Sequence, residues 1–358
     1  MPLWIDDPGA LRHHLQQPPS WVGLDTEFIR ERTYWPQLAL VQLAIGEQIL
    51  LIDPLVPGMA DALKELLVDP KVLKVMHSAS EDLVTFKTAC GVVPSPLFDT
   101  QVAAALAGLA SGMGYQRLVD ALTGIHVDKG ETRSDWMRRP LSDSQLHYAA
   151  EDVAHLGVMY RDLDARLQAL GRRAWLDADC NRLASAIDQD LPDRWPHLSM
   201  RSAQFLDPAA QRRLLRVLRW RDLQARRSDK PRTWILDNEL AATLAKQPPA
   251  DLPALQDWLE KQPKAPRKLA EAIWQALVTP TDDEEDVPLA RAATDADKKR
   301  LKRMQDAVVA HSAALALPDG ILASRRWLEQ LQDTGHWPEA LSGWRREQLE
   351  PVLAPLLA

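Results

Sequence analysis

The stretch of residues 21–28 constrains this chain most, because its apolar run ends in two carboxylates, Asp25 and Glu27. The run predicts a β-strand, in which alternate side chains point to the same face, so both carboxylates share one face. Neighbouring like charges repel, and burying either one is costly unless a cation compensates. Mg²⁺, which takes oxygen ligands, is a natural compensator. A lone Asp-x-Glu pair is more simply the solvated end of a strand. Only other residues of the chain can therefore distinguish a metal site from a solvated strand end.

Length and composition indicate an ordinary globular protein of more than one domain. The chain has 358 residues, 46% of them hydrophobic and 26% charged, so two or three domains are expected. Cys90 and Cys180 make neither a disulfide framework nor a C-x-x-C motif, which favours a reducing compartment. No apolar run reaches the roughly 18 residues of a membrane span, and the N-terminus lacks a signal-peptide pattern. We therefore expect a cytoplasmic protein with no membrane partner.

The net charge of −7 at pH 7 argues against a protein that binds nucleic acid through its overall charge. The basic residues are nevertheless clustered, at 138–139, 212–221, 226–232 and 298–303, while acidic residues concentrate at 282–286. A single basic cluster is more often a solvated helix face than a binding site. The charge pattern therefore permits nucleic acid as a partner but does not indicate it.

The order of the predicted elements indicates an α/β fold with a mixed sheet. Two β-rich runs at 38–45 and 48–52 follow the first strand and predict a hairpin. Helices and strands then alternate as far as residue 122. A later helix begins at Ser142, which matches a capping box with Gln145, and is predicted to continue to about Leu170.

From about residue 202 only helices are predicted, which divides the chain into four segments. They are an α/β domain at 1–200, a helical module at 201–280, an acidic linker at 281–294 and a second helical module at 295–358. The acidic, proline-containing stretch is predicted to be a linker because it cannot bury itself.

Three further acidic positions accompany the pair on the first strand. Asp82 lies in the first turn of a predicted helix. Asp152 follows Tyr148 by four residues on a later helix, so Tyr148 and Asp152 share a helix face. Asp99 also precedes a helix, where it more simply acts as a cap. Each position alone has an ordinary explanation, as a helix cap or as part of a polar surface. Together, a strand Asp-x-Glu, an Asp at a helix start and a late Tyr-x-x-x-Asp are typical of DEDD exonucleases.

The flanking sequence closely resembles one family. Residues 25–42 resemble the first motif region of ribonuclease D, residues 77–83 and 98–101 the second, and residues 148–152 the third. Residues 219–240 resemble the first HRDC module of that family, and the residues after 295 resemble a second one more weakly. The resemblance implies a ribonuclease-H-like exonuclease domain with a mixed sheet, followed by two all-α HRDC-type modules. It also implies 3′→5′ hydrolysis of RNA to 5′-monophosphates, at the 3′ ends of structured RNA such as tRNA precursors.

The resemblance further implies two divalent metal ions, Mg²⁺ or Mn²⁺, held by four carboxylates: Asp25, Glu27, Asp82 and Asp152. Two such ions can stabilise the attacking and the leaving oxygen of an in-line displacement. Tyr148 is neutral at pH 7, because the pKa of tyrosine lies near 10. Its expected role is therefore to orient the attacking water.

His147 offers an alternative to Tyr148. A sister subfamily carries a histidine five residues before the last Asp, and the residues from His147 to Asp152 satisfy that pattern as well. Neighbouring helical residues point about 100° apart, so only one of the two is expected to face the metals. We favour Tyr148 because the flanking motifs resemble the tyrosine subfamily.

Candidates for substrate binding flank the catalytic motifs. Arg30, Arg32 and Gln42 adjoin the first motif and could contact phosphates or order the site, with internal salt bridges as the simpler alternative. Trp35 could stack on a base or simply pack. In the first helical module a phosphate track would comprise Arg226, Arg227, Lys230 and Arg232, whereas the nearby Trp220 and Trp234 are expected to be core residues.

Two other functions stay open at this point. The same carboxylates could serve a DNA exonuclease of this fold, because contacts to the 2′-OH distinguish the two sugars. The fold could also be a catalytically inert RNA-binding scaffold, but a missing carboxylate would favour that function and none is missing. A monomer is expected, since the resemblance suggests no symmetric assembly.

Overall fold

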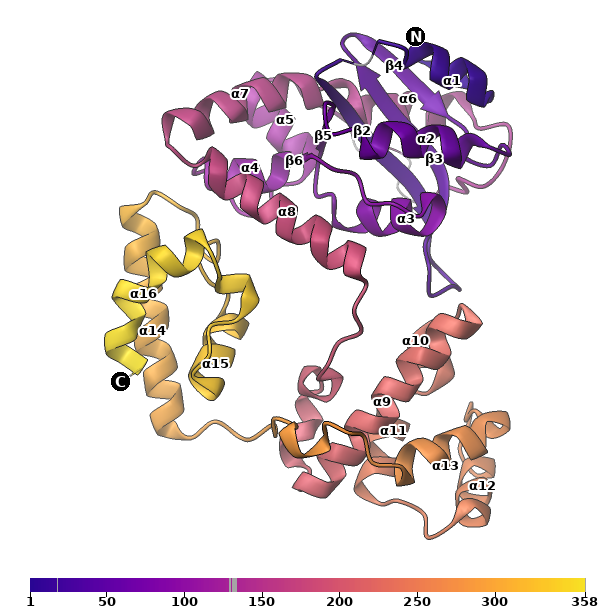
Figure 1. Cartoon of the computed structure of the whole chain (residues 1–358), viewed down its shortest axis with the longest axis vertical. Coiled ribbons are helices and arrows are strands. Elements are labelled where there is room, and N and C mark those ends of the chain that lie inside the picture. The colour runs from indigo at the N-terminus through magenta and orange to yellow at the C-terminus, as the bar shows by residue number, and fades with distance from the viewer. Residues whose placement is uncertain (18, 129, 131–133, 358) are drawn as a thin grey trace. The chain divides into compact units, whose positions relative to one another are not determined.

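The computed structural model describes residues 1–17, 19–128, 130 and 134–357 (Figure 1). Its contacts divide the chain into two compact units. The first unit comprises Met1–Ile29, Pro36–Asp190 and Asp295–Ala358. The second unit comprises Arg30–Trp35 and Leu191–Thr294. The chain therefore passes between the units after residues 29, 35, 190 and 294.

A mixed sheet forms the centre of the first unit and confirms the predicted α/β class. Its strands in the described chain are β1 (Leu3–Ile5), β2 (Trp21–Ile29), β3 (Gln37–Ile45), β4 (Gln48–Ile52), β5 (Leu73–Met76) and β6 (Leu97–Asp99). They lie in the order β1-β4-β3-β2-β5-β6. The carboxylate strand β2 runs antiparallel to β3 and parallel to β5. It is therefore an inner strand, held by a neighbour on each side.

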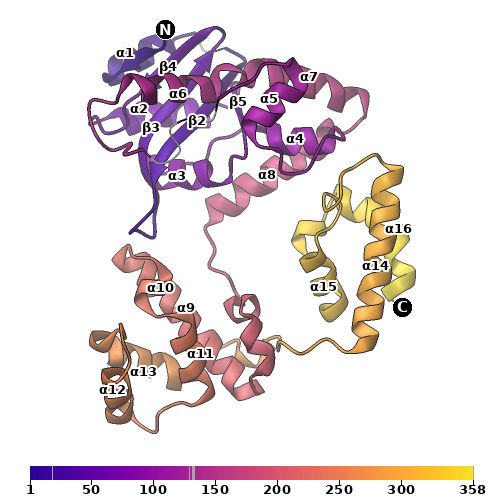
Figure 2. The ribbon, with the colours of Figure 1, turned by 180° about the vertical axis from the view of Figure 1, so that it is seen from behind.

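Helices cover both faces of this sheet, α2 and α3 on one face and α6 on the other (Figures 1 and 2). The helices of the first unit are α1 (Pro8–His14), α2 (Met59–Val68), α3 (Ser80–Cys90), α4 (Thr100–Leu106), α5 (Tyr115–Thr123), α6 (Asp143–Ala154), α7 (Leu156–Ala169), α8 (Arg173–Gln189), α14 (Asp295–Ala314), α15 (Arg325–Thr334) and α16 (Trp344–Leu357). One cluster of buried apolar side chains runs from the sheet through α7 and α8 into α14 and α16. The C-terminal helices therefore share a core with the sheet.

Gly23 allows the start of α7 to pack closely against β2. A Cβ at this position would lie 3.1 Å from the Ala44 Cβ and 3.2 Å from the Leu156 Cβ. Contacts this short would force a neighbour to move, and Gly23 lies on the same face of β2 as Asp25. A side chain at residue 23 would therefore disturb the packing next to the carboxylates.

The predicted single helix from Ser142 to Leu170 is wrong, because the structure has two helices that meet at His155. The predicted start is confirmed: Ser142 and Gln145 form a capping box. The break is explained by Tyr115, whose hydroxyl donates to the Glu151 carbonyl at 2.8 Å and accepts from the His155 backbone N–H at 3.1 Å. The hydroxyl thus replaces one hydrogen bond of the helical ladder, which is a known cause of sharp kinks.

The second unit consists of helices around their own apolar cluster. They are α9 (Pro208–Ser228), α10 (Arg232–Ile235), α11 (Asn238–Lys246), α12 (Leu252–Glu260) and α13 (Ala270–Val278), with short 3₁₀ turns at Pro196–Ser199, Arg201–Phe205, Arg267–Leu269 and Glu284–Asp286. Leu214 and Leu218 of α9, Leu244 of α11 and Ile273 of α13 are buried in the cluster. This part of the chain is all-helical, as predicted.

The acidic stretch near residue 283 differs from the expectation that it stays unpacked. Arg219 of α9 donates to both carboxylate oxygens of Asp283, at 2.8 and 2.9 Å. Val287, a few residues on, is only 6% exposed. Asp283 is therefore held against the basic helix α9 by ion pairing, whereas Asp282, Glu285 and Asp286 remain exposed.

Within the described residues, no helix is long and apolar enough to cross a membrane. The two cysteines, Cys90 and Cys180, are both buried as free thiols.

A buried ion pair ties the C-terminal helices to α8. Arg345 of α16 donates to both carboxylate oxygens of Asp179, with 2.8 Å between Nη2 and Oδ2. Both side chains are only 8% exposed, and the adjacent Trp344 ring stacks on Trp175 at 4.4 Å between centroids. Such a pair is costly to break on one side, because the remaining charge stays buried without a partner.

We expect Arg345→Ala to lower the free energy of unfolding by about 3–5 kcal/mol. The neighbouring Arg346→Ala is the matched control, since Arg346 pairs with Glu350 on the surface, where both side chains are 49% exposed. That change should cost far less than Arg345→Ala, because solvent-exposed ion pairs contribute little to stability. Urea unfolding followed by circular dichroism measures both variants. Equal small losses would show that the Asp179–Arg345 pair does not hold the C-terminal helices.

Candidate active site

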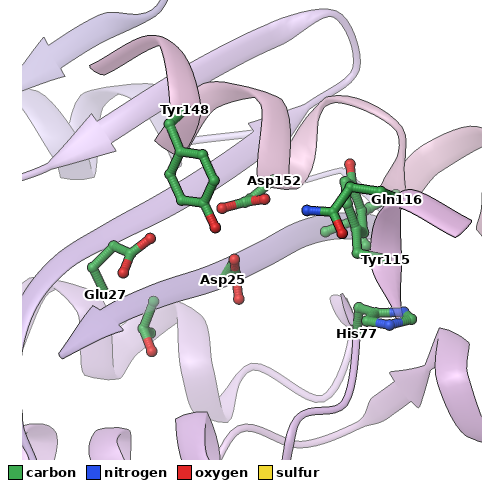
Figure 3. A pocket seen from close by; sticks show the side chains of 9 residues that line it. Asp25, Glu27, His77, Tyr115, Gln116, Tyr148 and Asp152 are labelled. Carbon is green, nitrogen blue, oxygen red and sulfur yellow. The ribbon is translucent and has the colours of Figure 1, made fainter. Parts of the chain in front are cut away.

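A cavity of about 240 Å³ brings together four of the five predicted catalytic residues (Figure 3). Asp25 and Glu27 enter it from β2, and Tyr148 and Asp152 enter it from α6. Figure 3 shows the side chains of Tyr148 and Asp152 descending from their helix toward Asp25. The strand alternation and the four-residue helical spacing that the sequence indicated are the reason that these four groups meet.

The end of β2 is shaped by an irregularity next to the carboxylates. The register between β2 and β3 shifts between Glu27 and Phe28. Such bulges are common beside active sites, because they turn the strand and redirect its side chains. Here the shift follows directly after Glu27, so both carboxylates lie on the regular part of the strand, before the bulge.

Asp82 does not line the cavity but lies close behind it. It occupies the first turn of α3, where it accepts a hydrogen bond from the Thr26 hydroxyl. The turn before α3 is held by Asp99, which accepts from the backbone N–H groups of Ser78 at 3.1 Å and Ala79 at 2.9 Å. Asp99 also caps α4, as predicted. It therefore fixes two helix starts at once, including the one that carries Asp82.

Burial and mutual repulsion raise the pKa values of the carboxyl groups. At Asp25 burial is the largest cause, followed by repulsion from Asp82, Asp152 and Glu27, and its pKa lies well above the ordinary value. Burial and repulsion raise the pKa of Glu27 to about 8. Burial raises the pKa of Asp152 to about 7 and that of Asp82 to about 6, against opposing hydrogen bonds from Tyr148 and Thr26. The site therefore favours protons or cations as counter-charges.

The donor set suits a hard divalent cation, because carboxylates supply both oxygen ligands and negative charge. In the part of the chain that the structure describes, however, no three His, Cys, Asp or Glu side chains converge tightly enough to hold an ion as they stand. The residues therefore fit this class of ion, and binding would have to draw them closer.

Tyr148 and His147 occupy different environments. Tyr148 lines the cavity, and burial raises the pKa of its hydroxyl. A Cβ at Gly130 would lie 2.3 Å from the Tyr148 Cδ2, so the backbone at Gly130 packs against this ring. His147 is exposed and is not among the residues that line the cavity. The geometry favours Tyr148 as the residue that faces the carboxylates.

The rest of the cavity wall consists of residues that sequence reasoning did not single out as site residues. They are Thr26, His77, Tyr115, Gln116 and Leu156. His77 belongs to the second motif region, so its position there was the available signal. No sequence signal marked Gln116 or Leu156, because their position at the cavity depends on how α5 and α7 pack.

Gln42 cannot contact substrate directly in this structure, because its side chain is completely buried. It lies on β3 opposite Asp25. Of the two roles expected for it, ordering the site is therefore the one compatible with its position.

Several of the predicted RNA-binding groups make contacts inside the second unit. Arg226 and Arg232 form ion pairs with Asp222, at 2.9 and 2.5 Å. Both guanidinium groups also lie over the Tyr34 ring, at 5.3 and 4.7 Å from its centroid. Trp35 packs in the same cluster, so packing is the role that its position supports.

Other candidates are accessible. Arg30, Arg32, Arg227 and Lys230 are exposed. Trp220 packs against the apolar clusters of this unit, as expected. Trp234 was expected in the core but is 59% exposed, because the short helix α10 directs it outward while Ile235 fills the buried position.

The chain matches known proteins over its whole length. Residues 4–168 match a family model described as 3′-5′ exonuclease. A ribonuclease D of Xanthomonas oryzae is 63% identical, covering 100% of this chain and 99% of that protein. A ribonuclease D of Pseudomonas paraeruginosa is 35% identical, covering 98% and 96%. The crystal structure of Escherichia coli RNase D, described as an exoribonuclease involved in structured RNA processing, is similar with a TM-score of 0.86 and 30% identity, covering 100% of this chain and 98% of that one. On these grounds the chain belongs to the ribonuclease D family.

Proposed function

We propose that this protein is a 3′→5′ exoribonuclease that releases 5′-monophosphates from the 3′ ends of structured RNA, with tRNA precursors as the proposed example. The observation that carries the proposal is the gathering of Asp25, Glu27, Tyr148 and Asp152 around one cavity. Asp82 lies near enough for its charge to raise the pKa of Asp25. The description of the Escherichia coli relative supports structured RNA as the substrate class.

Exonucleases of this fold depend on divalent metal ions, which supply an activated water and stabilise the leaving oxygen when bound. We propose two ions, Mg²⁺ or Mn²⁺, with Asp25, Glu27, Asp82 and Asp152 as the residues that would hold them. Tyr148 keeps its proton at neutral pH, because burial raises its pKa. Its hydroxyl therefore acts as a hydrogen-bonding group that orients water, rather than as a base.

The helical parts are proposed to grip the RNA. We propose HRDC-type modules at 201–280 and 295–358, joined by the segment 281–294. Arg227, Lys230 and Arg232 have exposed side chains in the sequence around Trp234, whose ring is exposed too. Cationic groups beside an exposed ring suit contacts to phosphates and bases without sequence preference. The proposed working form is a monomer.

Stepwise shortening of RNA is the first test. A 3′-extended RNA with Mg²⁺ should lose nucleotides one at a time from its 3′ end, and EDTA should stop the loss because the carboxylates need a cation. Asp25→Asn should reduce the rate to background, whereas Asp61→Asn, at an exposed position on α2, should leave it unchanged. Gel analysis over time measures the products.

The same assay separates the competing functions. RNA that is bound but not shortened with either Mg²⁺ or Mn²⁺ would favour the inert scaffold. Faster loss of DNA of the same sequence would overturn the assignment of RNA as substrate.

The choice between Tyr148 and His147 is tested by kinetics. Tyr148→Phe keeps the ring but removes the hydroxyl, so kcat should fall by about 10²-fold, with KM for RNA unchanged. His147→Ala should leave both parameters unchanged, because His147 points away from the cavity lining. The reverse result would assign the water-orienting role to His147.

The raised carboxyl pKa values predict a pH-dependent stability in EDTA. Each group has a higher pKa in the folded than in the unfolded protein, so the folded state binds more protons between the two values. This stabilisation is complete below the unfolded pKa of about 4 and is lost as pH rises through about 6 to 8. Urea unfolding in EDTA should therefore show a lower stability at pH 8 than at pH 5.

Two controls belong to this measurement. Added Mg²⁺ should restore more stability at pH 8 than at pH 5, because protons compete with the ion at lower pH. Asp25→Asn should flatten the pH dependence, since it removes one of the repelling charges. If the free energy of unfolding of that variant changed with pH as steeply as that of wild type, repulsion at the site would not be the cause of the pH dependence.

A further inference from the structure

Gln42 is a buried amide whose hydrogen-bonding groups are unused. Its side chain has no exposed surface. Over the described residues, neither the nitrogen nor the oxygen of this amide has a hydrogen-bond partner. Buried polar groups in native proteins are nearly always paired, because an unpaired one has lost its water without compensation. The position therefore requires an explanation.

The register of the sheet points the amide toward one group. Gln42 lies directly opposite Asp25 on β2, and directly opposite residues of antiparallel strands share a face, with Cβ atoms about 4.5–5.5 Å apart. On its other side Gln42 is opposite Leu51 of β4. Leu51 belongs to an apolar cluster under α6 that includes Trp136 and Ala149. Of the two cross-strand neighbours, only Asp25 can accept a hydrogen bond.

The same burial separates Gln42 from the substrate. Gln42 is not among the residues that line the cavity, whereas Asp25 is. A group with no exposed surface can influence a reaction in the cavity only through a neighbour that reaches it. The cavity residue directly opposite Gln42 on the neighbouring strand is Asp25.

We propose that Gln42 is a positioning residue: its amide nitrogen donates a hydrogen bond to Asp25 when a divalent cation is bound, and thereby fixes the orientation of that carboxylate. Both parts rest on the proposed metal ligands, and only the part in catalysis rests on the proposed exonuclease activity as well. Hydrogen bonds to the carboxylates that hold a metal typically change metal affinity or activity by 10–100-fold. On this proposal, the amide that has no partner here donates its hydrogen bond to Asp25 in the cation-bound state.

The test replaces the amide without changing the packing. Gln42→Met has a similar length and no amide, so it removes the hydrogen bond and also the unpaired buried group. Leu51→Met is the matched control, because it introduces the same side chain at the other cross-strand neighbour, away from Asp25. Swaps of similar volume are the ones that cores tolerate best.

Cation affinity, measured on the full chain without RNA, decides the question. Isothermal titration with Mn²⁺ should show about 10–100-fold weaker binding for Gln42→Met and unchanged binding for Leu51→Met. Unfolding in EDTA should show that Gln42→Met is at least as stable as wild type. Unchanged Mn²⁺ affinity in a folded Gln42→Met protein would overturn the proposal, and so would an equal loss in Leu51→Met.

Two further measurements locate the effect. In the double variant with Asp25→Asn, Gln42→Met should weaken Mn²⁺ binding no further, because it acts through Asp25; an additional tenfold loss would contradict that route. On RNA, Gln42→Met should lower kcat at limiting Mg²⁺ with KM for RNA unchanged, and a rise in KM alone would instead make Gln42 a substrate contact. If wild type binds Mn²⁺ but degrades no RNA, the proposed function fails while the titration still tests Gln42.

Discussion

The repulsion among carboxylates enclosed at the end of β2 is the constraint on which the rest of the first unit depends. Asp25 and Glu27 stay close together only because the surrounding elements hold the backbone that carries them in place. β2 is fixed between two strands, Asp99 fixes the turn that presents Asp82, and α6 is held over the cavity from its capping box onward. The free energy for holding these charges together comes from burial of the apolar core of this unit.

Much of the site could be predicted because its parts are local. An Asp-x-Glu on a strand, an Asp in the first turn of a helix and a Tyr four residues before an Asp each obey a short-range rule of geometry. The capping box at Ser142 and the cap at Asp99 are equally local, and both are present in the structure. Most strands of the sheet followed from the same kind of reasoning, since they are short apolar runs with clear ends, but the three-residue strand β1 was not predicted.

What could not be predicted depends on partners distant in sequence. The end of α6 is set by the Tyr115 hydroxyl, 40 residues away from His155, and no local pattern announces that. The acidic residues near 283 looked unable to bury themselves until Arg219 paired with Asp283 across 64 residues. Trp234 is exposed because Ile235 takes the buried position in a four-residue helix. The burial of Gln42 likewise depends on β4 and α6, so only the fold could separate its two expected roles.

The discontinuity of both units has a consequence for how the chain is made. The first unit needs Asp295–Ala358, which is made after its other segments, and the second unit needs Arg30–Trp35, which is made long before its other segment, Leu191–Thr294. At about 5–20 residues per second, the early segments wait on the order of tens of seconds for their partners. During that time the surface later covered by α14 and α16 is exposed on the nascent chain. Neither core can therefore close before its latest segment is made, Leu191–Thr294 for the second unit and Asp295–Ala358 for the first.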